Sequence, residues 1–391
     1  MSLLNIRSGF VALTIAVTLL FATARSAEAD EATMSVLMDS VLAGDASDAA
    51  LAARAAADRG GDRLLGQLAI ELEDLVRGDY ATRGNRSFSD LKPFWQQARA
   101  RWVAARQPAK GATLPSNILK LPSSVQTVFS IDAGQSTGWL LKRDLQGNWF
   151  VADAYYLSVG AAGVDKFRRG DRRTPLGVYW IVEELDSTRL PPRYGVRVFP
   201  IDYPNALDEH QSRKGDGIWI HGIDPDNNIR PPQDTDGCIA LVNERILSLG
   251  EALSPRETPV IVARSLSWQD RPRPDAVLNE IERRLSDWRT ALTAGDVDRY
   301  LSVFADDYSR FGLPPSQWRA SRRAALRSNP VQSVTINELA VLLADSDSKI
   351  YVTRFRQVIS RAGADPVTVL RRFYWQADAE GRFRIIAEQN G

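Results

Sequence analysis

The sequence predicts a multidomain α+β protein with a helical N-terminal region, a mainly-β central domain and a C-terminal α+β domain. Three observations lead to this prediction. Alanine and leucine recur at helical spacing before residue 108, apolar residues alternate with a period of two from Val125, and Arg271-Pro272-Arg273-Pro274 precedes a helical stripe and further alternating segments. A chain of 391 residues is long enough for two or three domains.

The first 29 residues have the composition of a secretory signal peptide. Arg7 supplies a positive charge, residues 9–24 are largely apolar, and Ala27-Glu28-Ala29 forms a small-x-small cleavage site. The apolar run is shorter than the roughly 20 residues that a membrane span needs, so we favour cleavage over a short membrane anchor. We therefore predict a signal peptide at 1–29, no membrane span after its removal, and a periplasmic location.

Residues 30–110 are predicted to be a helical region. Alanine-rich runs favour helix, and Gly60-Gly61 divides the stretch into at least two helices. Trp95 and Trp102 share one face of a further helix, which is more typical of a core than of a ligand site. Helical packing and partner binding both remain open for this region. A segment with Pro108, Pro115 and Pro122 then leads into the next domain.

A mainly-β domain is predicted for residues 120–264. Several short apolar segments are separated by glycines and turn residues, which is typical of a β-sandwich or a small barrel. The predicted strands are 125–131, 139–142, 149–152, 155–159, 177–182, 196–201, 218–220 and 259–263, with one helix at 244–253.

Cys238 and His221 are the candidate catalytic pair of this domain. Cys238 is the only cysteine of the chain, and His221 is one of two histidines, 17 positions earlier. A thiol needs a base or a positive field to become a nucleophile near neutral pH, and imidazole is the usual partner. The alternative is a small buried thiol and an unrelated histidine. Two features favour catalysis: Cys238 follows Gly237 in a polar loop, and His221 ends an apolar run before Gly222.

Export strengthens the catalytic interpretation. A secreted chain with one thiol cannot form an internal disulfide, and a free thiol in an oxidising compartment must be buried or used. His210 lies in a polar, charged stretch where no second histidine or cysteine is spaced for a shared metal ion. We expect neither a metal nor a cofactor.

These residues resemble the YkuD-type L,D-transpeptidase family, whose signature is a histidine, an intervening loop and Ser/Thr-x-Gly-Cys. His221, Thr235, Gly237 and Cys238 fall on it; Asp236 stands where the family often has His, and Ala240 where it often has Arg. The run 235–243 looks more like the YafK-like branch. A second segment, Lys166 and then 170–179 (Gly-Asp-Arg-Arg-Thr-Pro-Leu-Gly-Val-Tyr), is similar to another family motif. The resemblance covers about residues 125–264.

The resemblance implies a peptidoglycan acyltransferase. Cys238 would be the nucleophile and His221 the general base and proton donor. The thiolate would form a thioester with a peptidoglycan stem tetrapeptide, cut between the L-centre of diaminopimelate and the terminal D-Ala. An amine of a second stem would then accept the acyl group. Backbone N–H groups at a tight turn or helix start after Gly237 would stabilise the oxyanion.

Further residues are candidates for binding substrate or shaping the site. Asp236 would raise the thiol pKa, so we expect it to turn outward, to cap the turn or to contact an amine acceptor. Lys166 and two arginines could bind stem-peptide carboxylates, although such cations are often simply solvated. The complete set of substrate-binding or site-shaping candidates is Gly222, Thr235, Asp236, Gly237, Arg172, Arg173, Tyr203 and Asn243.

Residues 272–391 are predicted to form the C-terminal domain. Asp275 would cap a helix at 276–294 whose apolar stripe includes Ile281, Leu285 and Trp288; a second helix follows at 297–304. Strands are expected at 334–342, 349–360, 367–377 and 382–388. This order resembles the NTF2-like/SnoaL-like cone fold, and Tyr308, Trp318 and Trp375 are candidates for lining a pocket. The alternative is that these aromatics form a core.

Three functions follow from these observations. The first is an L,D-transpeptidase in cell-wall cross-linking or remodelling. The second uses the same site to hydrolyse peptidoglycan or to release wall-linked protein. The third is a non-catalytic wall-binding adaptor in which Cys238 is buried and unreactive. The expected partners are peptidoglycan stem peptides, and a protein bound by the helical or NTF2-like domain is a further candidate. A net charge of +1 with dispersed basic residues gives no case for nucleic acid.

Overall fold

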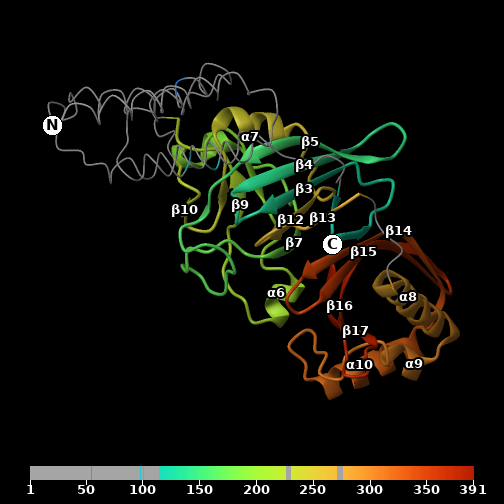
Figure 1. Ribbon diagram of the computed structural model, residues 1–391. Coiled ribbons are helices and arrows are strands. Elements are labelled where there is room, and N and C mark those ends of the chain that lie inside the picture. Colours follow the sequence, from blue (N-terminus) through green and yellow to red (C-terminus); the bar gives the residue numbers. More distant parts are fainter. Residues whose placement is uncertain (1–53, 55–96, 98–99, 101–113, 226–229, 271–275) are drawn as a thin grey trace, which may run out of the picture. The chain divides into compact units, whose positions relative to one another are not determined.

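The computed structural model describes residues 54, 97, 100, 114–225, 230–270 and 276–391 (Figure 1). The predicted signal peptide and nearly all of the predicted helical region lie outside the described residues. The described residues 114–225, 232–270 and 276–391 belong to one compact unit, which contains both folded domains discussed below. Within the described residues, no helix combines the length and apolar character needed to cross a membrane.

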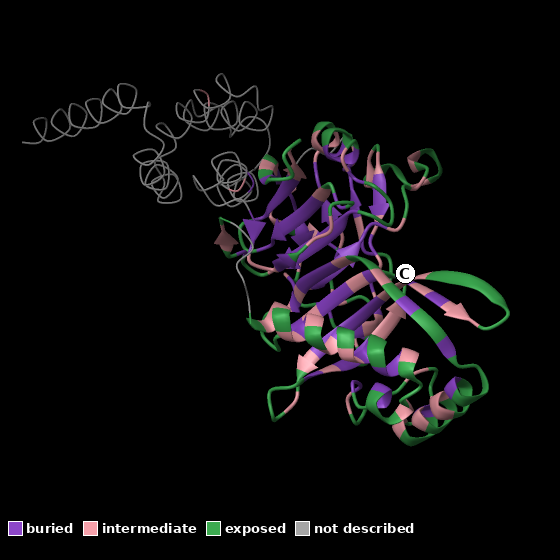
Figure 2. Ribbon diagram, turned by 90° about the vertical axis from the view of Figure 1, so that its right-hand side faces the viewer, coloured by how far each residue is buried: buried purple, intermediate pink, exposed green. Residues whose placement is uncertain are grey.

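A five-stranded sheet with the order β5-β4-β3-β12-β7 forms the centre of the first domain. Its strands are β3 (Thr127–Asp132), β4 (Thr137–Arg143), β5 (Trp149–Tyr156), β7 (Gly177–Trp180) and β12 (Pro259–Ala263). Strand β12 runs parallel to β3, and the other neighbours are antiparallel. The strands are predominantly apolar because both faces of this sheet are covered, as the buried colouring in Figure 2 shows.

Alternate residues of the central strands enter two different cores. Phe129 and Ile131 of β3 pack with Ile220 and Ile239, which belong to a smaller sheet on that face. Val128, directly before Phe129, belongs to the core on the opposite face. That core also contains Trp139, Trp180, Leu342 and Tyr374, so it joins the first domain to the C-terminal one. The period of two seen in the sequence therefore divides side chains between two buried layers.

The smaller sheet has the order β11-β9-β8. It consists of β8 (Val198–Pro200), β9 (Trp219–His221) and β11 (Ile239–Ala240). Two further short strands, β6 (Val159–Gly160) and β10 (Gln233–Thr235), pair in parallel beside it. The helices of this domain are α6 (Ala206–His210) and α7 (Asn243–Gly250).

One predicted strand differs in the structure. The segment 155–159 is not a single strand, because Tyr155 and Tyr156 complete β5 and Val159 begins β6. The intervening Ser158 instead exchanges two backbone hydrogen bonds with Ala240, each of 2.9 Å. This isolated bridge attaches the end of the central sheet to β11, which a local sequence pattern cannot specify.

The C-terminal domain places three helices against a curved antiparallel sheet. The helices are α8 (Ala276–Ala294), α9 (Val297–Leu301) and α10 (Pro315–Ser328), and the strands are β14 (Val331–Asp345), β15 (Ile350–Arg361), β16 (Ala364–Ala377) and β17 (Phe383–Asn390). The predicted stripe of α8 is buried at Ile281, Leu285 and Trp288. Helix α10 was not anticipated; its polar sequence buries only Trp318 and Leu326.

The predicted pocket aromatics are core residues. Tyr308, Trp318 and Trp375 are all buried, and Phe304 packs against the first two with ring centroids 4.8 and 4.9 Å apart. The Trp375 indole N–H donates to Thr353 Oγ1 at 2.9 Å. The expectation of a pocket lined by these three residues is therefore wrong, because their own rings fill the space between the helices and the sheet.

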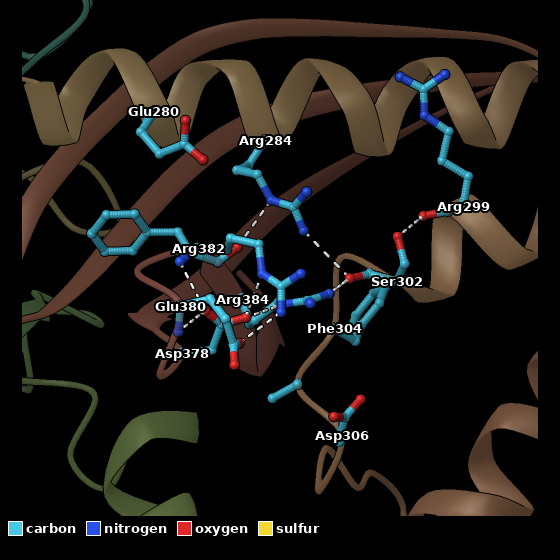
Figure 3. Close-up of polar contacts among 12 residues, drawn as sticks. Glu280, Arg284, Arg299, Ser302, Phe304, Asp306, Asp378, Glu380, Arg382 and Arg384 are labelled. Carbon is cyan, nitrogen blue, oxygen red and sulfur yellow. Dashed lines mark hydrogen bonds and ion pairs between the residues drawn. The ribbon is translucent and has the colours of Figure 1, made fainter.

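A polar cluster joins the helices of this domain to its last strand (Figure 3). Arg284 of α8 and Arg384 of β17 both donate to the carbonyl of Ser302, directly after α9. Arg382 and Arg384 also pair with Asp378, each at 3.0 Å. Burial, and then the neighbouring Arg384, lower the pKa of Arg284. One carbonyl and one carboxylate thus hold three guanidinium groups together.

The two domains are joined by strand pairing and by a buried ion pair. Strand β2 (Ile118–Lys120), which precedes the first domain, pairs with β14 as the fifth strand of the C-terminal sheet. Upstream of it, β1 (Leu114–Pro115) pairs with β13 (Trp268–Gln269). Asp202 accepts a hydrogen bond from Arg372 and another, of 2.7 Å, from the Trp180 N–H. The Arg372 guanidinium lies 4.1 Å from the centre of the Trp180 ring.

We predict that Asp202→Asn lowers the free energy of unfolding by about 3–5 kcal/mol, because it leaves the buried charge of Arg372 unpaired. The side chains of Arg372 and Asp202 are 6% and 15% exposed. Glu251→Gln is the matched control, since it breaks the ion pair between Arg197 and the side chain of Glu251, which is 82% exposed. This substitution should lower the free energy of unfolding by about 1 kcal/mol or less. Urea unfolding measures both; equal midpoints would contradict the role of the buried pair.

Candidate active site

The parallel pairing of β9 and β11 brings His221 and Cys238 together. Ile220 lies opposite Ile239, and His221 lies opposite Ala240. Cys238 directly precedes β11 and is two positions before Ala240, so side-chain alternation places it on the same face as His221. Two residues separated by 17 positions in the sequence thus face the same space.

The turn before the cysteine is organised by Thr235. Its hydroxyl accepts a hydrogen bond from the Gly237 N–H at 3.1 Å and donates to the Cys238 carbonyl at 2.6 Å. Gly237 has a φ of 127°, and a Cβ there would lie 2.6 Å from the Arg173 carbonyl oxygen. Only glycine meets both conditions without strain. Strand β11 begins at Ile239, directly after Cys238, so a tight turn leads into a strand here and the helix start considered for this position is wrong.

Thr174 supports the same turn from the second motif. Its buried hydroxyl donates to the Gly237 carbonyl and accepts from the Gly160 N–H, both at 2.9 Å. Sequence reasoning quoted Thr174 within a motif but did not include it among the site residues. The position of Thr174 directly before Pro175 was the available signal of a role in the site. Its hydrogen-bond partner, the Gly237 carbonyl, lies 63 positions away in the sequence, so the contact could not be predicted locally.

Gly222 and Asn243 fix the loop that leaves His221. The Asn243 side chain accepts from the Ile223 N–H at 3.1 Å and donates to the Ile223 carbonyl at 2.9 Å. A Cβ on Gly222 would lie 2.3 Å from the Asn243 amide oxygen, so the close approach requires glycine. Both residues therefore shape the site by positioning its backbone.

The environment of His221 selects one of its two neutral forms. Its Nδ1 lies 2.5 Å from the Gly222 carbonyl oxygen. Because a carbonyl only accepts, Nδ1 carries the proton, and Nε2 is left as the acceptor nitrogen. The buried imidazole also packs edge-on against the Tyr194 ring, with centroids 5.1 Å apart. Tyr194 was not anticipated, since no local signal connects it to either motif.

Cys238 is partly exposed, and its thiol is held in the neutral form. Sγ donates to the Gly217 carbonyl oxygen at 3.4 Å. Burial raises the pKa of the Cys238 thiol, and the charge of Asp236 raises it further. A hydrogen bond from the Trp219 backbone and the positive charges of Arg193 and Lys166 act in the opposite direction. The net shift is upward, so the resting residue needs a base to become a nucleophile.

Asp236 and Arg172 form an exposed ion pair beside the cysteine. Arg172 Nε lies 3.4 Å from Asp236 Oδ1, and the two side chains are 59% and 86% exposed. Such a pair contributes little to stability because water screens it. Asp236 turns toward solvent, where it is free to contact a ligand.

The loop that carries the arginines is anchored by Lys166 and Asp171. Their charged atoms are 2.8 Å apart and their side chains are 4% and 8% exposed. Asp171 also accepts hydrogen bonds from three backbone N–H groups, those of 167, 168 and 173. These contacts hold the pKa of the Asp171 carboxyl well below its usual range. Lys166 is thus committed to the loop, which does not match its expected role as a carboxylate-binding residue.

Arg173 and Tyr203 are also engaged within the domain. Arg173 Nη1 donates to the Val164 carbonyl at 2.8 Å. Tyr203 is buried against Tyr179, with ring centroids 6.0 Å apart, and its hydroxyl donates to the Lys214 carbonyl. Tyr203 is therefore a core residue, and the structure does not group it with the His221–Cys238 pair. Among the described residues, no three His, Cys, Asp or Glu side chains are grouped to hold a metal ion.

Comparison with known proteins agrees with this geometry. Residues 131–262 match the YkuD family model, the L,D-transpeptidase catalytic domain, and residues 280–389 match the Cds6 C-terminal NTF2-like domain. No curated protein matches the chain.

Two solved structures share the fold. Pgp2 of Campylobacter jejuni, a helical cell shape determining protein, is 19% identical with a TM-score of 0.58, and the match covers 75% of this chain and 100% of that one. Bd1075 of Bdellovibrio bacteriovorus is 20% identical with a TM-score of 0.58, over 71% and 98% of the two chains. The predicted α+β fold class is confirmed. Residues 131–262 thus form a YkuD-type L,D-transpeptidase catalytic domain, and residues 280–389 form an NTF2-like domain.

Proposed function

We propose that the protein is a peptidoglycan L,D-transpeptidase in which Cys238 is the nucleophile and His221 is the base. The observation that carries this proposal is the parallel register of β9 and β11, which directs both side chains to one face. The protonated Nδ1 of His221 leaves Nε2 to take the thiol proton. A partly exposed Cys238 is also accessible to a peptide.

The reaction would proceed through a thioester. His221 Nε2 takes the proton of Cys238 as Sγ attacks the peptide carbonyl that follows the L-centre of diaminopimelate. The C–N bond then breaks, and the imidazolium gives its proton to the departing D-Ala amine. An amine of a second stem attacks the thioester, restores the thiol and completes the cross-link. Water in place of the amine would give the hydrolase.

The Gly237 N–H is not available as an oxyanion donor, because it already donates to the Thr235 hydroxyl. The Thr235–Gly237 turn instead fixes the direction from which Sγ attacks. Its two anchors, Thr235 and Thr174, hold the peptide groups on either side of Gly237. Such positioning is a major source of catalytic rate because it removes the need to align reacting groups.

Stem peptides fit the charges around the site. They carry both carboxylates and an amine, and the site carries Arg172 and Arg193 together with Asp236. We propose periplasmic action after signal-peptide cleavage, and the NTF2-like domain as a surface for a protein partner. The non-catalytic adaptor is the alternative from another class; it expects an unreactive Cys238, so the alkylation experiment below distinguishes it from the enzyme.

Disaccharide-tetrapeptide muropeptides provide the direct test. We expect the mature protein to form cross-linked dimers, and Cys238→Ala to lower their rate by about a thousandfold or more, because the nucleophile is removed. Chromatography and mass spectrometry identify the products. Tripeptide without dimer would establish the hydrolase. Equal product from the wild type and Cys238→Ala would contradict the role of the cysteine.

Alkylation by iodoacetamide tests the electrostatics of the thiol. The thiolate is the reactive form, so the rate should rise with pH, with a midpoint above the ordinary thiol value because the pKa of Cys238 is raised. Asp236→Asn removes a charge that favours the neutral thiol, and we expect its midpoint to move to lower pH. Glu251→Gln, an exposed acid that pairs with Arg197, is the control. A midpoint that stays in place in Asp236→Asn would refute this account.

Thr174 tests whether the turn positions the nucleophile. Thr174→Val retains the shape but removes the hydrogen bond to the Gly237 carbonyl, so we expect kcat to fall by about tenfold or more. Thr174→Ser retains the hydroxyl and should remain close to wild type. Product formation measures kcat, and thermal melting shows whether each variant is folded. The idea fails if the valine and serine variants turn over at the same rate.

A further inference from the structure

Arg193 is held on the His221 side of the site by a series of ring contacts. It lies on a single turn of 3-10 helix, η3 (Pro192–Tyr194). Its guanidinium lies over the Tyr194 ring, 4.8 Å from the centroid, and donates to the Tyr194 hydroxyl at 2.9 Å. The Tyr194 ring in turn packs against Trp219 and His221, with centroid distances of 4.8 and 5.1 Å. The positive charge therefore has a defined position beside the imidazole.

The backbone after η3 touches the loop that leaves His221. Gly195 has a φ of 65°, and a Cβ there would lie 2.3 Å from the Asn243 amide oxygen and 2.6 Å from the Gly222 carbonyl carbon. Ser187 donates to the Val196 carbonyl at 2.8 Å, which holds the next residue. This close packing fixes η3, and with it Arg193, relative to the histidine.

The other cations near the thiol are already occupied. Lys166 is buried against Asp171, Arg172 pairs with Asp236, and Arg173 donates to a carbonyl. Within the described part of the chain, the Arg193 guanidinium has no carboxylate partner and contacts only the phenol of Tyr194. It is exposed, so its remaining N–H groups face solvent. A guanidinium in this state is suited to bind a carboxylate through two hydrogen bonds.

The chemistry of the leaving group determines where a carboxylate would lie. His221 must give its proton to the departing amine, so that nitrogen has to be within hydrogen-bond distance of the imidazole. In a stem tetrapeptide this nitrogen belongs to the terminal D-Ala. The free carboxylate of D-Ala is bonded to the same α-carbon as the amine, and it must therefore also lie on the His221 side.

We infer that Arg193 binds the terminal carboxylate of the acyl donor and thereby directs cleavage to its last residue. This inference rests on the proposed function. As Sγ bonds to the carbonyl carbon, the C–N bond breaks and the nitrogen takes the proton from His221. D-Ala then leaves with its carboxylate still paired to Arg193. A donor extended by one residue places its carboxylate beyond this position and should be a poorer substrate.

Two donor peptides test the inference: a muropeptide ending in D-Ala, and the same molecule ending in D-alaninamide. For the wild type we expect the amide to raise KM about 10- to 100-fold, the range for hydrogen bonds to a charged group. Arg193→Gln should raise KM for the acid by a similar factor and no longer distinguish the acid from the amide. Arg193→Lys should recover part of the preference, and kcat should change less than KM.

Arg189→Gln is the matched control, because Arg189 is an exposed arginine on the neighbouring turn, η2 (Ser187–Arg189). It should keep the full preference for the acid. Thermal melting compares the folding of all variants. If Arg193→Gln distinguishes the two peptides as strongly as the wild type does, the inference is overturned even though the enzyme is active.

A binding measurement separates this inference from the proposed function. Calorimetry with Cys238→Ala protein measures the affinity for each peptide without turnover. If the wild type turns over neither peptide, the proposed function fails. The carboxylate contact would still be supported if Cys238→Ala binds the acid more tightly than the amide and the double variant Cys238→Ala/Arg193→Gln binds the two peptides equally. Equal binding of acid and amide to Cys238→Ala, or no binding of either, would overturn it.

Discussion

The structure of the site depends on the parallel pairing of two very short strands. Parallel neighbours need a long connection, and the segment between His221 and Cys238, which includes β10, provides it for β9 and β11. So few ladder hydrogen bonds cannot hold such strands by themselves. Their burial against Phe129 and Ile131, and the hydrogen bonds of Thr174, Thr235 and Asn243, supply what the ladder lacks. The geometry of the proposed catalytic site therefore depends on residues to which we assign no chemistry.

The sequence predicted the chemical groups of the site better than the residues that support them. The glycines at 222 and 237 could be identified because each depends on a local constraint: a close approach and a tight turn. His221 and Cys238 were proposed as a catalytic pair from their residue types and the family resemblance, and that pairing stays a prediction. Thr174 and the Lys166–Asp171 pair act through contacts that only the folded chain creates. Tyr203 shows the opposite error, since a tyrosine near a motif has no local feature that separates a core position from a site.

The fold showed the same division between local and long-range information. Helix α8 and the four long strands of the C-terminal sheet repeat apolar residues over many positions, so their periods were easily recognised. Helix α10 was missed because only Trp318 and Leu326 of its residues are buried. The fifth strand of that sheet, β2, comes from a proline-rich lead-in more than 200 positions away. Its pairing couples the NTF2-like domain to the catalytic sheet through one shared core.

The charges around Cys238 suit a thiol that reacts only when substrate is present. Burial and Asp236 keep it protonated, and the thiolate is the form that oxidants and stray electrophiles attack. For the exported enzyme that we propose, a neutral resting thiol would therefore preserve the nucleophile. In the proposed reaction, a peptide that covers the site would bring His221 Nε2, Sγ and the carbonyl into one water-poor space. Proton transfer to the imidazole would then accompany attack, and the raised pKa would protect the thiol between turnovers without preventing the reaction.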